Sequence, residues 1–430
     1  MAKPRHIDVV KAYLNADIDE EILCYPPSDP NEEFFTGKPV FKLQKALYGL
    51  KQSAYLWNQL ITEFLRSLGF CRHRTEQCLF SKTDRAYDRG ALETNIFVYV
   101  DDLIVASQCV VLRNHYVDLI SRRFSTTDEG DLREYLGVNI EFEYKNDMRK
   151  CRLDQTKYIM KKLKEFGMSN CKGAVTPLTR GVRFSSMETL GRLDFPYRQM
   201  LGSLIHAMNW TRPDLAYAIN MLSRFSITPT LRATKEITRV FQYLRSTAEL
   251  QLTYVVDASD AADMYNYRMI SYTDSDFAGC LDTGRSITSY LTYMGPALLS
   301  WRSRRQNIVA QSSTEAEYVA MNEGYGSILE YEHIMKDDYY LDFIDKPIMY
   351  VDNQSAIGIV VDDSALQRSR QFRVIHHRFH DAIAQHDLMI LKIDSNQNHA
   401  DIGTKSLDGP DHNRHLIGLG LIAPHDDDFN

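Results

Sequence analysis

Long apolar runs, paired cysteines and internal repeats are all missing from this 430-residue sequence. No apolar run approaches the roughly 18 residues of a membrane span, which argues against an integral membrane protein. The seven cysteines are scattered without a C-x-x-C pair, which argues against a disulfide framework and against a structural zinc site. The start, MAKPRHIDVV, has no signal-peptide pattern, so we expect a reducing, intracellular setting.

Positive charge is unevenly distributed, although the net charge of -7 does not by itself suggest a nucleic-acid-binding protein. Residues 149–183 hold ten Lys and Arg against two acids. A second basic cluster consists of Arg368, Arg370, Arg373, Arg378, His376, His377 and His380. Each stretch is either a solvated helix face or a surface that contacts phosphates. The net charge does not decide between the two.

Hydrophobic periodicity predicts an α/β protein of about two or three domains. The stretch HIDVVKAYLNADI is typical of a short strand that runs into a helical turn. YLWNQLITEFLRSLGF is typical of a helix, with apolar residues at i, i+4 spacing from Leu56 to Leu68 on one face. Residues 153–250 are mostly helical in pattern. From about residue 265 the order becomes β-β-β-α-β-α-β, which indicates a mixed sheet with helices packed on it.

Two adjacent aspartates, Asp101 and Asp102, interrupt the apolar, β-branched run IFVYVDDLIVA. Asp is a common turn former, so the run predicts a β-hairpin with both acids at its turn. Asp8 has a similar setting in the apolar stretch HIDVV. Two strands that carry acids at their ends can meet in one sheet and hold a metal pair, which would offset the cost of placing carboxylates there. The pattern alone leaves both a plain turn and a metal centre open.

Four further acids occur at telling places in the C-terminal α/β region. They are Asp274 on the first strand, Glu317 on the helix, Asp352 at a strand end and Asp401 in NHADIGTK. Taken singly, each is typical of a surface acid or a helix cap. As a group of carboxylates in an open site, they favour Mg²⁺ or Mn²⁺ over zinc.

The segments around these acids resemble the reverse transcriptase–RNase H portion of copia-type retrotransposon polyproteins. The resemblance rests on YVDD at Tyr99–Asp102 and on HIDVVKAYLNADI and FKLQKALYGLKQSAYLW before it. It continues through YLGVNIEF, QTKYIMKKLKEFGMSNCKGAVTPL, YRQMLGSLIHAMNWTRPDLAYAINMLSRF and FQYLRSTAELQL. These matches run in order through almost the whole chain. The resemblance implies a reverse transcriptase palm and a helical thumb or connection region, followed by an RNase H-like mixed-sheet domain.

The resemblance also implies roles for particular residues. Asp8 and Asp101 would bind the catalytic metals, with Asp102 as the weaker third acid. Tyr13 falls where the family carries an aromatic ring beneath the incoming sugar, although its helical spacing also suits a core residue. Contacts to the template or the nucleotide are implied for Tyr48, Gly49, Lys51 and Tyr99.

In the RNase H-like part, the resemblance makes the four later acids the metal ligands. These are Asp274, Glu317, Asp352 and Asp401, with Asp276 and Glu315 as the alternatives to the first two. Each of the two active sites is expected to hold two Mg²⁺ or Mn²⁺ ions.

The sequence departs from the family pattern in two places. Only seven residues precede Asp8, so the fingers segment that grips the triphosphate is expected to be largely missing. Many RNases H carry a mobile histidine loop about ten residues before the last acid, but that position is Leu391 here, in a strand-like run. His376 and His380 lie four residues apart, yet no Cys or third histidine is well placed. A polycationic surface is therefore favoured over a zinc site.

The resulting hypothesis divides the chain into a palm at 1–150, a thumb or connection region at 151–262, an RNase H-like domain at 263–415 and a loose tail at 416–430. The predicted function is RNA-directed DNA synthesis together with hydrolysis of RNA in RNA–DNA hybrids. One alternative is an RNase H-only nuclease with a non-polymerising platform, and another is a non-enzymatic nucleic-acid-binding remnant. Expected partners are an RNA template, a DNA primer, an RNA–DNA hybrid, dNTPs and other parts of the polyprotein, without a membrane. The expected location is the cytoplasm, within a virus-like particle, or the nucleus.

Overall fold

The computed structural model divides the chain into two compact units. The first is built from Met1–Leu132, and the second from Arg133–Lys336 and the chain from residue 340 onward. The structure describes residues 3–25, 40–86, 90–145, 148–191, 194–257, 268–338, 346–361, 378–379, 381–383, 385 and 387–424.

The first unit is a six-stranded sheet in the order β4-β5-β6-β7-β1-β8. Its strands are β1 (Arg5–Val9), β4 (Cys71–Arg72), β5 (Leu79–Ala86), β6 (Gly90–Tyr99), β7 (Asp102–Ser107) and β8 (Thr126–Asp131). The helical elements are η1 (Ala12–Asn15), α1 (Ser53–Ser67) and α2 (Val110–Arg123). A separate two-stranded ribbon pairs β2 (Leu23–Cys24) with β3 (Phe41–Lys42). The predicted strand and helical turn at the start, and the hairpin at residues 96–106, are confirmed.

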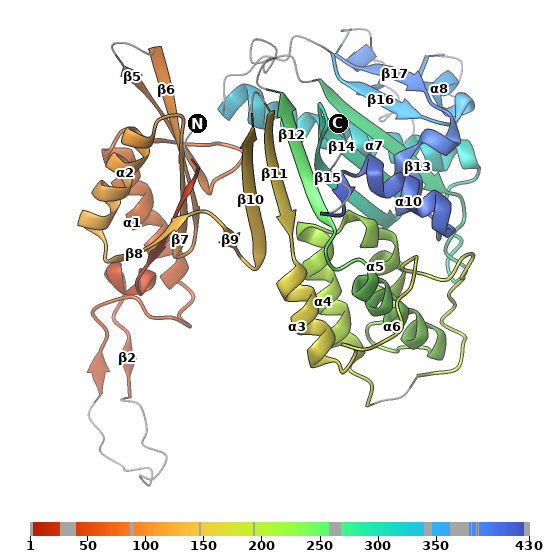
Figure 1. Ribbon diagram of the computed structural model, residues 1–430, viewed down its shortest axis with the longest axis horizontal. Helices are drawn as coiled ribbons and strands as arrows, with labels where there is room; N and C mark the ends of the chain where they lie inside the picture. The colour runs from red at the N-terminus through yellow and green to blue at the C-terminus, as the bar shows by residue number, and fades with distance from the viewer. Residues whose placement is uncertain are drawn as a thin grey trace. The chain divides into compact units, whose positions relative to one another are not determined.

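One face of this sheet is buried and the other carries polar groups. Ile7 and Val9 of β1 are buried with Leu103 and Val105 of β7, in one core with residues of α1 and α2 (Figure 1). Because successive strand residues point to opposite faces, Asp8 and Asp102 lie on the face away from this core. The sheet thus separates the helices from the acids.

The buried stripe of α1 is shifted by one residue from the predicted face. Trp57, Ile61 and Leu65 are buried, whereas Leu60 and Phe64 lie at the flank of the core and are only partly buried. The larger Trp57 ring sets this rotation, because it fits beneath the hairpin and its Nε1–H donates to the carbonyl oxygen of Val100 at 2.5 Å.

The second unit begins with a five-stranded sheet and a group of helices. The sheet has the order β18-β12-β11-β10-β9, with strands β9 (Glu134–Tyr135), β10 (Val138–Lys145), β11 (Met148–Asp154), β12 (Gln251–Asp257) and β18 (Leu421–Ile422). The helices are α3 (Thr156–Glu165), α4 (Tyr197–Trp210), η2 (Pro213–Leu215), α5 (Ala216–Ser223) and α6 (Leu231–Ser246). They share one large core. The predicted helical character of residues 153–250 is confirmed.

The predicted loose tail is wrong for residues 416–422. Residues up to Gly418 complete α10 (Gly409–Gly418), and β18 then pairs with β12. Leu419 and Leu421 are buried in a core with Leu252. This burial of leucine side chains holds the segment against the sheet.

A second five-stranded sheet, in the order β15-β14-β13-β16-β17, forms the C-terminal part of this unit. Its strands are β13 (Met269–Asp276), β14 (Ile287–Met294), β15 (Ala297–Arg305), β16 (Ile348–Val351) and β17 (Met389–Lys392). β13, β14 and β15 are antiparallel neighbours, whereas β16 and β17 run parallel to β13. The helices are α7 (Ser313–His333), α8 (Gln354–Val361) and the 3-10 helix η7 (His399–Gly403). The predicted β-β-β-α-β-α-β order is confirmed.

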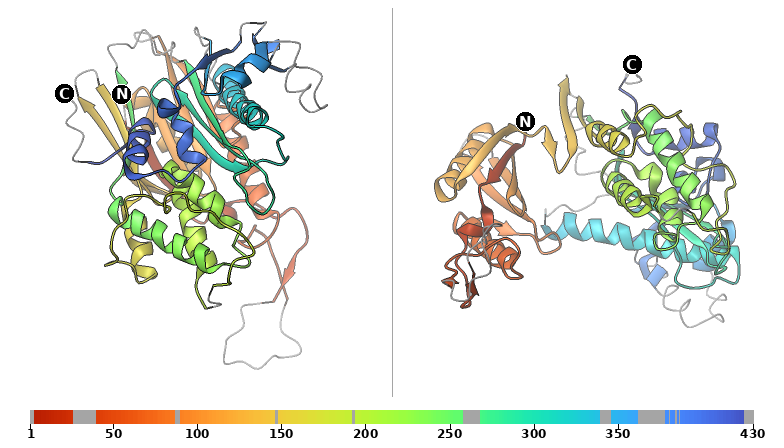
Figure 2. Two further views of the ribbon diagram at one scale, coloured as in Figure 1. Left: turned by 90° about the vertical axis from the view of Figure 1, so that its right-hand side faces the viewer. Right: turned by 90° about the horizontal axis from the view of Figure 1, so that it is seen from below.

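Helix α7 packs along β13 and β14 (Figure 2). The approach is close because Gly324 has no side chain: a Cβ there would lie 2.5 Å from Thr273 Cγ2. The next residue of β13, Asp274, therefore points to the other face, where it meets η7.

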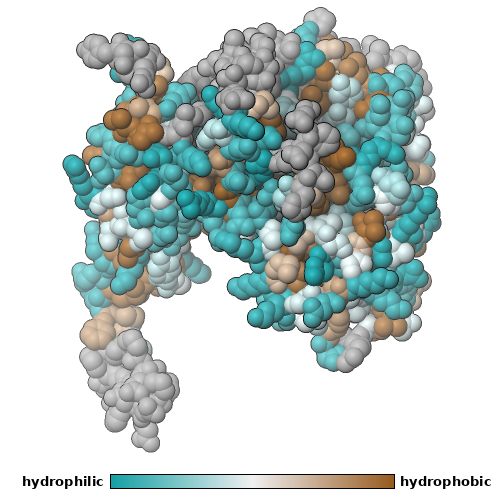
Figure 3. All heavy atoms as spheres, in the orientation of Figure 1, coloured by the Kyte–Doolittle hydropathy of each residue, from teal (hydrophilic) through white to brown (hydrophobic). Residues whose placement is uncertain are grey.

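The predicted mixed α/β class, with a mixed sheet in the C-terminal part, is confirmed. Among the described residues no helix is both long and apolar enough for a bilayer. On the face drawn in Figure 3, hydrophobic residues are scattered among hydrophilic ones. The bounds of the four segments given in the sequence analysis stay predictions.

The hairpin between β6 and β7 contains a strained residue that can be tested. Val100 has φ 56, a left-handed conformation that is costly for a β-branched side chain. Replacing Val100 with Gly is expected to raise the free energy of unfolding of the first unit by about 0.5–1 kcal/mol, measured by urea denaturation. The matched substitution Val110→Gly, at an exposed helix position, should lower it instead. A destabilised V100G variant would contradict this reading of the turn.

Candidate functional site

The acids of the C-terminal sheet meet at one edge because two parallel strands end there. β13 pairs Thr273 with Val351 of β16, so Asp274 and Asp352 come next at the same edge. η7 adds Asp401, which lies within this short 3-10 helix. One carboxylate oxygen from each of Asp274, Asp352 and Asp401 lies within 4.8 Å of the other two.

Hydrogen bonds hold two of these carboxylates and the chain segment that precedes the third. Thr404 Oγ1 donates to Asp274, and Ser395 Oγ donates to Asp352 Oδ2 at 2.8 Å. Asn398 Nδ2 donates to the carbonyl oxygen of Thr273 at 2.9 Å, which ties the chain before Asp401 to β13. The last acid is therefore held to the strand that carries the first.

Glu317 of α7 joins the group electrostatically. Its Oε1 accepts from the backbone N–H of Ser275 at 3.2 Å, while its buried Oε2 has no hydrogen-bond partner among the described residues. Burial, with the charges of Asp274 and Asp352 added, raises the pKa of Glu317 to about 9. Burial and Asp274 similarly raise the pKa of Asp401 to about 8. These acids repel one another and resist ionisation in the absence of a cation.

Lys405 is a functional residue that the sequence reasoning missed. Its Nζ lies 2.8 Å from Asp401 Oδ2. Burial opposes its charge, but Asp274 and Asp401 outweigh that effect, so the pKa of Lys405 is raised. The signal was available, because a lysine four residues after an acid can reach it over one helical turn.

The residues of this group fit a divalent cation. All the ligand atoms are carboxylate oxygens, which suit Mg²⁺ or Mn²⁺. Glu317 Oε2 and the buried Asp401 Oδ1 both lack a hydrogen-bond partner among the described residues. Buried acceptors of this kind are normally satisfied, and a divalent cation would supply a partner for both.

The acids of the first unit also share one place. Asp8 of β1 lies opposite Asp102 of β7, and the backbone N–H of Val9 donates to the carbonyl oxygen of Asp101 at 2.8 Å. Burial, together with the charges of Asp101 and Asp102, raises the pKa of Asp8. His6, two residues before Asp8 on the same face, lies with its Nε2 2.8 Å from Asp102 Oδ1. The period of two along a strand could have predicted this contact.

Aromatic residues border the acids of the first unit. The rings of Tyr13 and Tyr48 lie 4.4 Å apart between centroids, tilted by 37°. Burial and the charge of Asp101 raise the pKa of Tyr48, which places it beside the acids. Tyr99 lies opposite Asp102 and is 48% exposed.

Two further predicted contact residues follow Tyr48. Gly49 has φ 98, a backbone conformation that favours glycine, and a Cβ there would meet no atom within 4 Å. Lys51 is exposed.

Other predicted features have mixed outcomes. His376, His377 and His380 lie outside the described residues, as do Arg368, Arg370 and Arg373. Leu391, where a histidine loop was sought, lies in β17. Glu315 caps the start of α7, and its Oε2 accepts from the backbone N–H of Gln311 at 2.6 Å.

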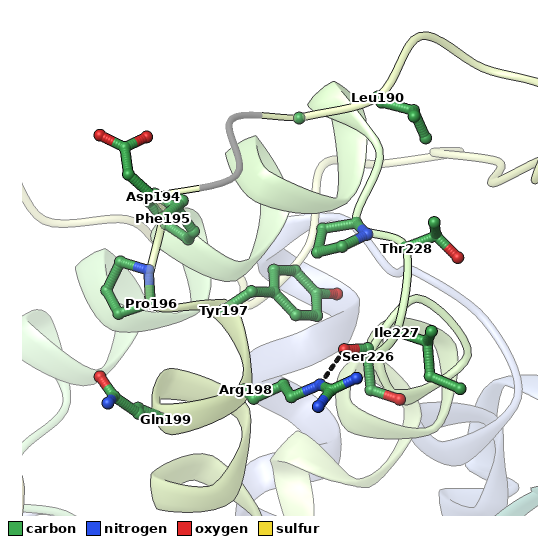
Figure 4. A pocket seen from close by; sticks show the side chains of 12 residues that line it. Leu190, Asp194, Phe195, Pro196, Tyr197, Arg198, Gln199, Ser226, Ile227 and Thr228 are labelled. Carbon is green, nitrogen blue, oxygen red and sulfur yellow. Dashed lines mark hydrogen bonds between the residues drawn. The ribbon is translucent and has the colours of Figure 1, made fainter.

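A cavity of about 410 Å³ lies at the start of α4, away from the acids. Figure 4 shows Tyr197 and Arg198 on one side and Ser226 and Ile227 on the other, with Arg198 Nε donating to the carbonyl oxygen of Ser226 at 2.7 Å. None of the predicted site residues lines it. Asp194 is a carboxylate among its lining residues, without a second acid beside it in that lining.

Comparisons with known sequences point to one group of proteins. The model of a family described as reverse transcriptase (RNA-dependent DNA polymerase) matches residues 3–180. The chain is 32% identical over 410 residues to the Retrovirus-related Pol polyprotein from transposon TNT 1-94 of Nicotiana tabacum, covering 93% of the chain and 29% of that polyprotein. It is 31% identical over 320 residues to a transposon Ty5-1 protein of Saccharomyces cerevisiae, covering 74% of the chain and 98% of that protein. The chain thus spans less than a third of the tobacco polyprotein.

Among solved structures, the chain is similar to a foamy viral protease-reverse transcriptase in complex with double-stranded DNA. The TM-score is 0.49 at 10% identity, with 91% of this chain and 57% of that chain covered. An RNase H1 from Halobacterium salinarum matches with a TM-score of 0.24 at 15% identity, covering 32% of this chain and 94% of that chain.

The raised pKa of Glu317 predicts a pH-dependent stability. The folded protein keeps a proton on Glu317 up to about pH 9, whereas the unfolded chain loses it near pH 4.5. The stabilisation is therefore complete below about pH 4.5 and is lost as the pH rises through about 9, at up to about 1.4 kcal/mol per pH unit. In the presence of a chelator, Glu317→Gln should make the free energy of unfolding fall less steeply with pH, as measured by urea denaturation at a series of pH values. Glu315→Gln is the control and should follow the wild type; equal slopes in all three would refute the assignment.

Lys405 should stabilise the metal-free protein and compete with divalent cations. Lys405→Met is expected to lower the thermal midpoint in chelator, because the acids lose their nearest cation. In millimolar Mg²⁺ the deficit should shrink, because the metal replaces the lost charge. Lys235→Met, at an exposed position of α6, controls for loss of a lysine. A deficit that Mg²⁺ does not reduce would show that Lys405 acts only through packing.

Proposed function

The chain belongs to the reverse transcriptase family of copia-type retrotransposons, and on that premise we propose that it combines RNA-directed DNA polymerase and RNase H activities. The observation that carries the proposal is the convergence of Asp274, Asp352 and Asp401 within 4.8 Å at one sheet edge. Carboxylates this close repel one another, and burying them is costly unless a cation offsets their charge. Lys405 pairs with only one of the three, Asp401.

Divalent metals, when bound, supply charge neutralisation and activation of a water or hydroxyl nucleophile in phosphodiester chemistry. In the second unit, Asp274, Glu317, Asp352 and Asp401 would hold them. Lys405 keeps a positive charge at Asp401 before and after the reaction. The reaction is hydrolysis: water attacks the phosphorus, the bond to the 3′-oxygen breaks, and a 3′-hydroxyl and a 5′-phosphate result.

In the first unit, Asp8, Asp101 and Asp102 would hold the metals of the polymerase. His6 holds Asp102 in place through its hydrogen bond. Tyr13, packed on Tyr48, would lie under the sugar of the incoming dNTP and exclude a 2′-hydroxyl. Tyr48, Gly49, Lys51 and Tyr99 are proposed to contact the nucleotide and template.

The proposed partners follow from these reactions and from the relatives. They are an RNA template, a DNA primer, an RNA–DNA hybrid and dNTPs, with two Mg²⁺ or Mn²⁺ ions in each site. The matched tobacco relative is named as a Pol polyprotein, so other parts of such a polyprotein are proposed partners too. The cytoplasm, within a virus-like particle, or the nucleus is the proposed location.

Two activity assays on the full chain test the proposal. We expect template–primer extension with dNTPs and Mn²⁺ to vanish in Asp101→Asn, and hybrid cleavage to vanish in Asp274→Asn. Each variant should keep the other activity, because the acids lie in different units. Asp118→Asn, an exposed acid of α2, is the control. If the unmodified chain cleaves the hybrid but does not extend the primer, the RNase H-only nuclease is favoured. If it shows neither activity, the non-enzymatic remnant is favoured.

A further inference from the structure

A buried network of charged and polar side chains lies outside both acidic clusters. Arg212 and Asp214 have fully buried side chains and form a two-pronged ion pair, with Nη2 2.7 Å from Oδ2 and Nε 3.0 Å from Oδ1. The hydroxyl of Tyr243 donates to Asp214 Oδ2 at 2.6 Å. His412 Nε2 lies 2.9 Å from the same hydroxyl. Four side chains from η2, its N-cap, α6 and α10 therefore form one connected chain.

Two further N–H donors of Arg212 bind Thr247. Arg212 donates to the carbonyl oxygen of Thr247 at 3.0 Å and to its hydroxyl at 2.8 Å. Although burial opposes the charge of Asp214, Arg212 and Tyr243 lower its pKa, so it stays ionised. Burial lowers the pKa of His412 to about 4. A neutral His412 can therefore donate to the Tyr243 hydroxyl, which in turn donates to Asp214.

An arrangement of this kind is an expensive way to join two parts of a protein. Well-packed apolar residues of similar volume usually stabilise a fold at least as much as a buried ion pair does. What the polar network adds is direction, because each hydrogen bond fixes one orientation of its partner. Such a fixed orientation matters most where a neighbouring functional side chain depends on it.

The network contacts the segment that follows Asp401. Three side-chain contacts tie this segment to the helical region: Gly181 N–H to Ser406 Oγ at 2.9 Å, Arg180 to Asp408 at 3.3 Å, and Tyr243 to His412. Asp214, Ile402, Lys405 and His412 also line one small void. The network thus packs directly behind the residues that carry Asp401 and Lys405.

We propose that Arg212, Asp214, Tyr243 and His412 form a positioning network for the nuclease centre. It holds the segment from Asp401 to His412 so that Asp401 faces Asp274 and Asp352 and Lys405 stays within reach of Asp401. None of the four touches substrate. The RNase H-like centre then depends on residues of the helical region 156–247, and the inference rests on the proposed function only where hybrid cleavage is the readout.

Metal binding tests this inference without relying on catalysis. Mn²⁺ affinity is measured by electron paramagnetic resonance on the full chain, in an Asp8→Asn/Asp101→Asn background that weakens the first cluster. Tyr243→Phe is expected to weaken Mn²⁺ binding at the second cluster about three- to tenfold, the effect of one lost hydrogen bond. In cleavage assays the Mn²⁺ requirement should rise while the KM for the hybrid stays unchanged.

The matched control is Tyr197→Phe. Tyr197 is also buried in the helical core, and its hydroxyl donates to the carbonyl oxygen of Leu222 at 2.8 Å, with no link to the segment after Asp401. This variant should lose stability but keep the wild-type Mn²⁺ affinity. If Tyr243→Phe does not fold, His412→Leu is used in its place and should weaken Mn²⁺ binding in the same way. His412→Gln keeps an N–H donor and should restore the Mn²⁺ affinity that His412→Leu loses.

Each outcome bears on one claim. Equal Mn²⁺ affinity in the Tyr243→Phe and Tyr197→Phe variants overturns the positioning role, whatever the cleavage assay gives. A selective loss of affinity in Tyr243→Phe supports the positioning role even if the wild type cleaves no hybrid, and that second result would count against the proposed function alone.

Discussion

Repulsion among converging carboxylates is the constraint on which the second unit depends. Two parallel strands and a 3-10 helix bring Asp274, Asp352 and Asp401 together, and α7 adds Glu317 from the side. Without a cation, two of these acids hold protons far above their ordinary pKa values. Lys405 and a bound metal are two ways to relieve the same repulsion. The stability and the chemistry of this centre are therefore linked through its charge.

The first unit handles its acids differently. Asp8 and Asp102 lie on the outer face of a sheet whose inner face is packed against two helices. Here a histidine, and not a lysine, contacts one of the acids. The sheet positions the carboxylates, and the packed rings of Tyr13 and Tyr48 lie beside them. Both clusters consist of carboxylates, but they are built on different backbone arrangements.

Much of this could be predicted from the sequence, because it follows local rules. Alternation along β1 and β7 places the acids on one face, and the order of strands places Asp274 beside Asp352. The rotation of α1 could not be predicted, because the Trp57 ring and not leucine spacing decides it. The placement of Asp401 could not be predicted from local pattern either, because Asn398 and Thr404 on both sides of it hydrogen-bond to β13, which is distant in the chain. The network of Tyr243 and His412 joins residues 169 apart in the chain, and no local pattern points to such a pair.

Proton release on metal binding tests the central claim most directly. If protons and a divalent cation compete for the same carboxylates, Mg²⁺ binding near neutral pH must displace the protons held by Glu317 and Asp401. Calorimetric titration of the full chain in the Asp8→Asn/Asp101→Asn background, in two buffers of different ionisation enthalpy, measures the number of protons released. The account predicts release of about one to two protons per chain, lost when Asp274 is replaced by Asn. Binding without proton release, or release that persists in the Asp274→Asn variant, would contradict it.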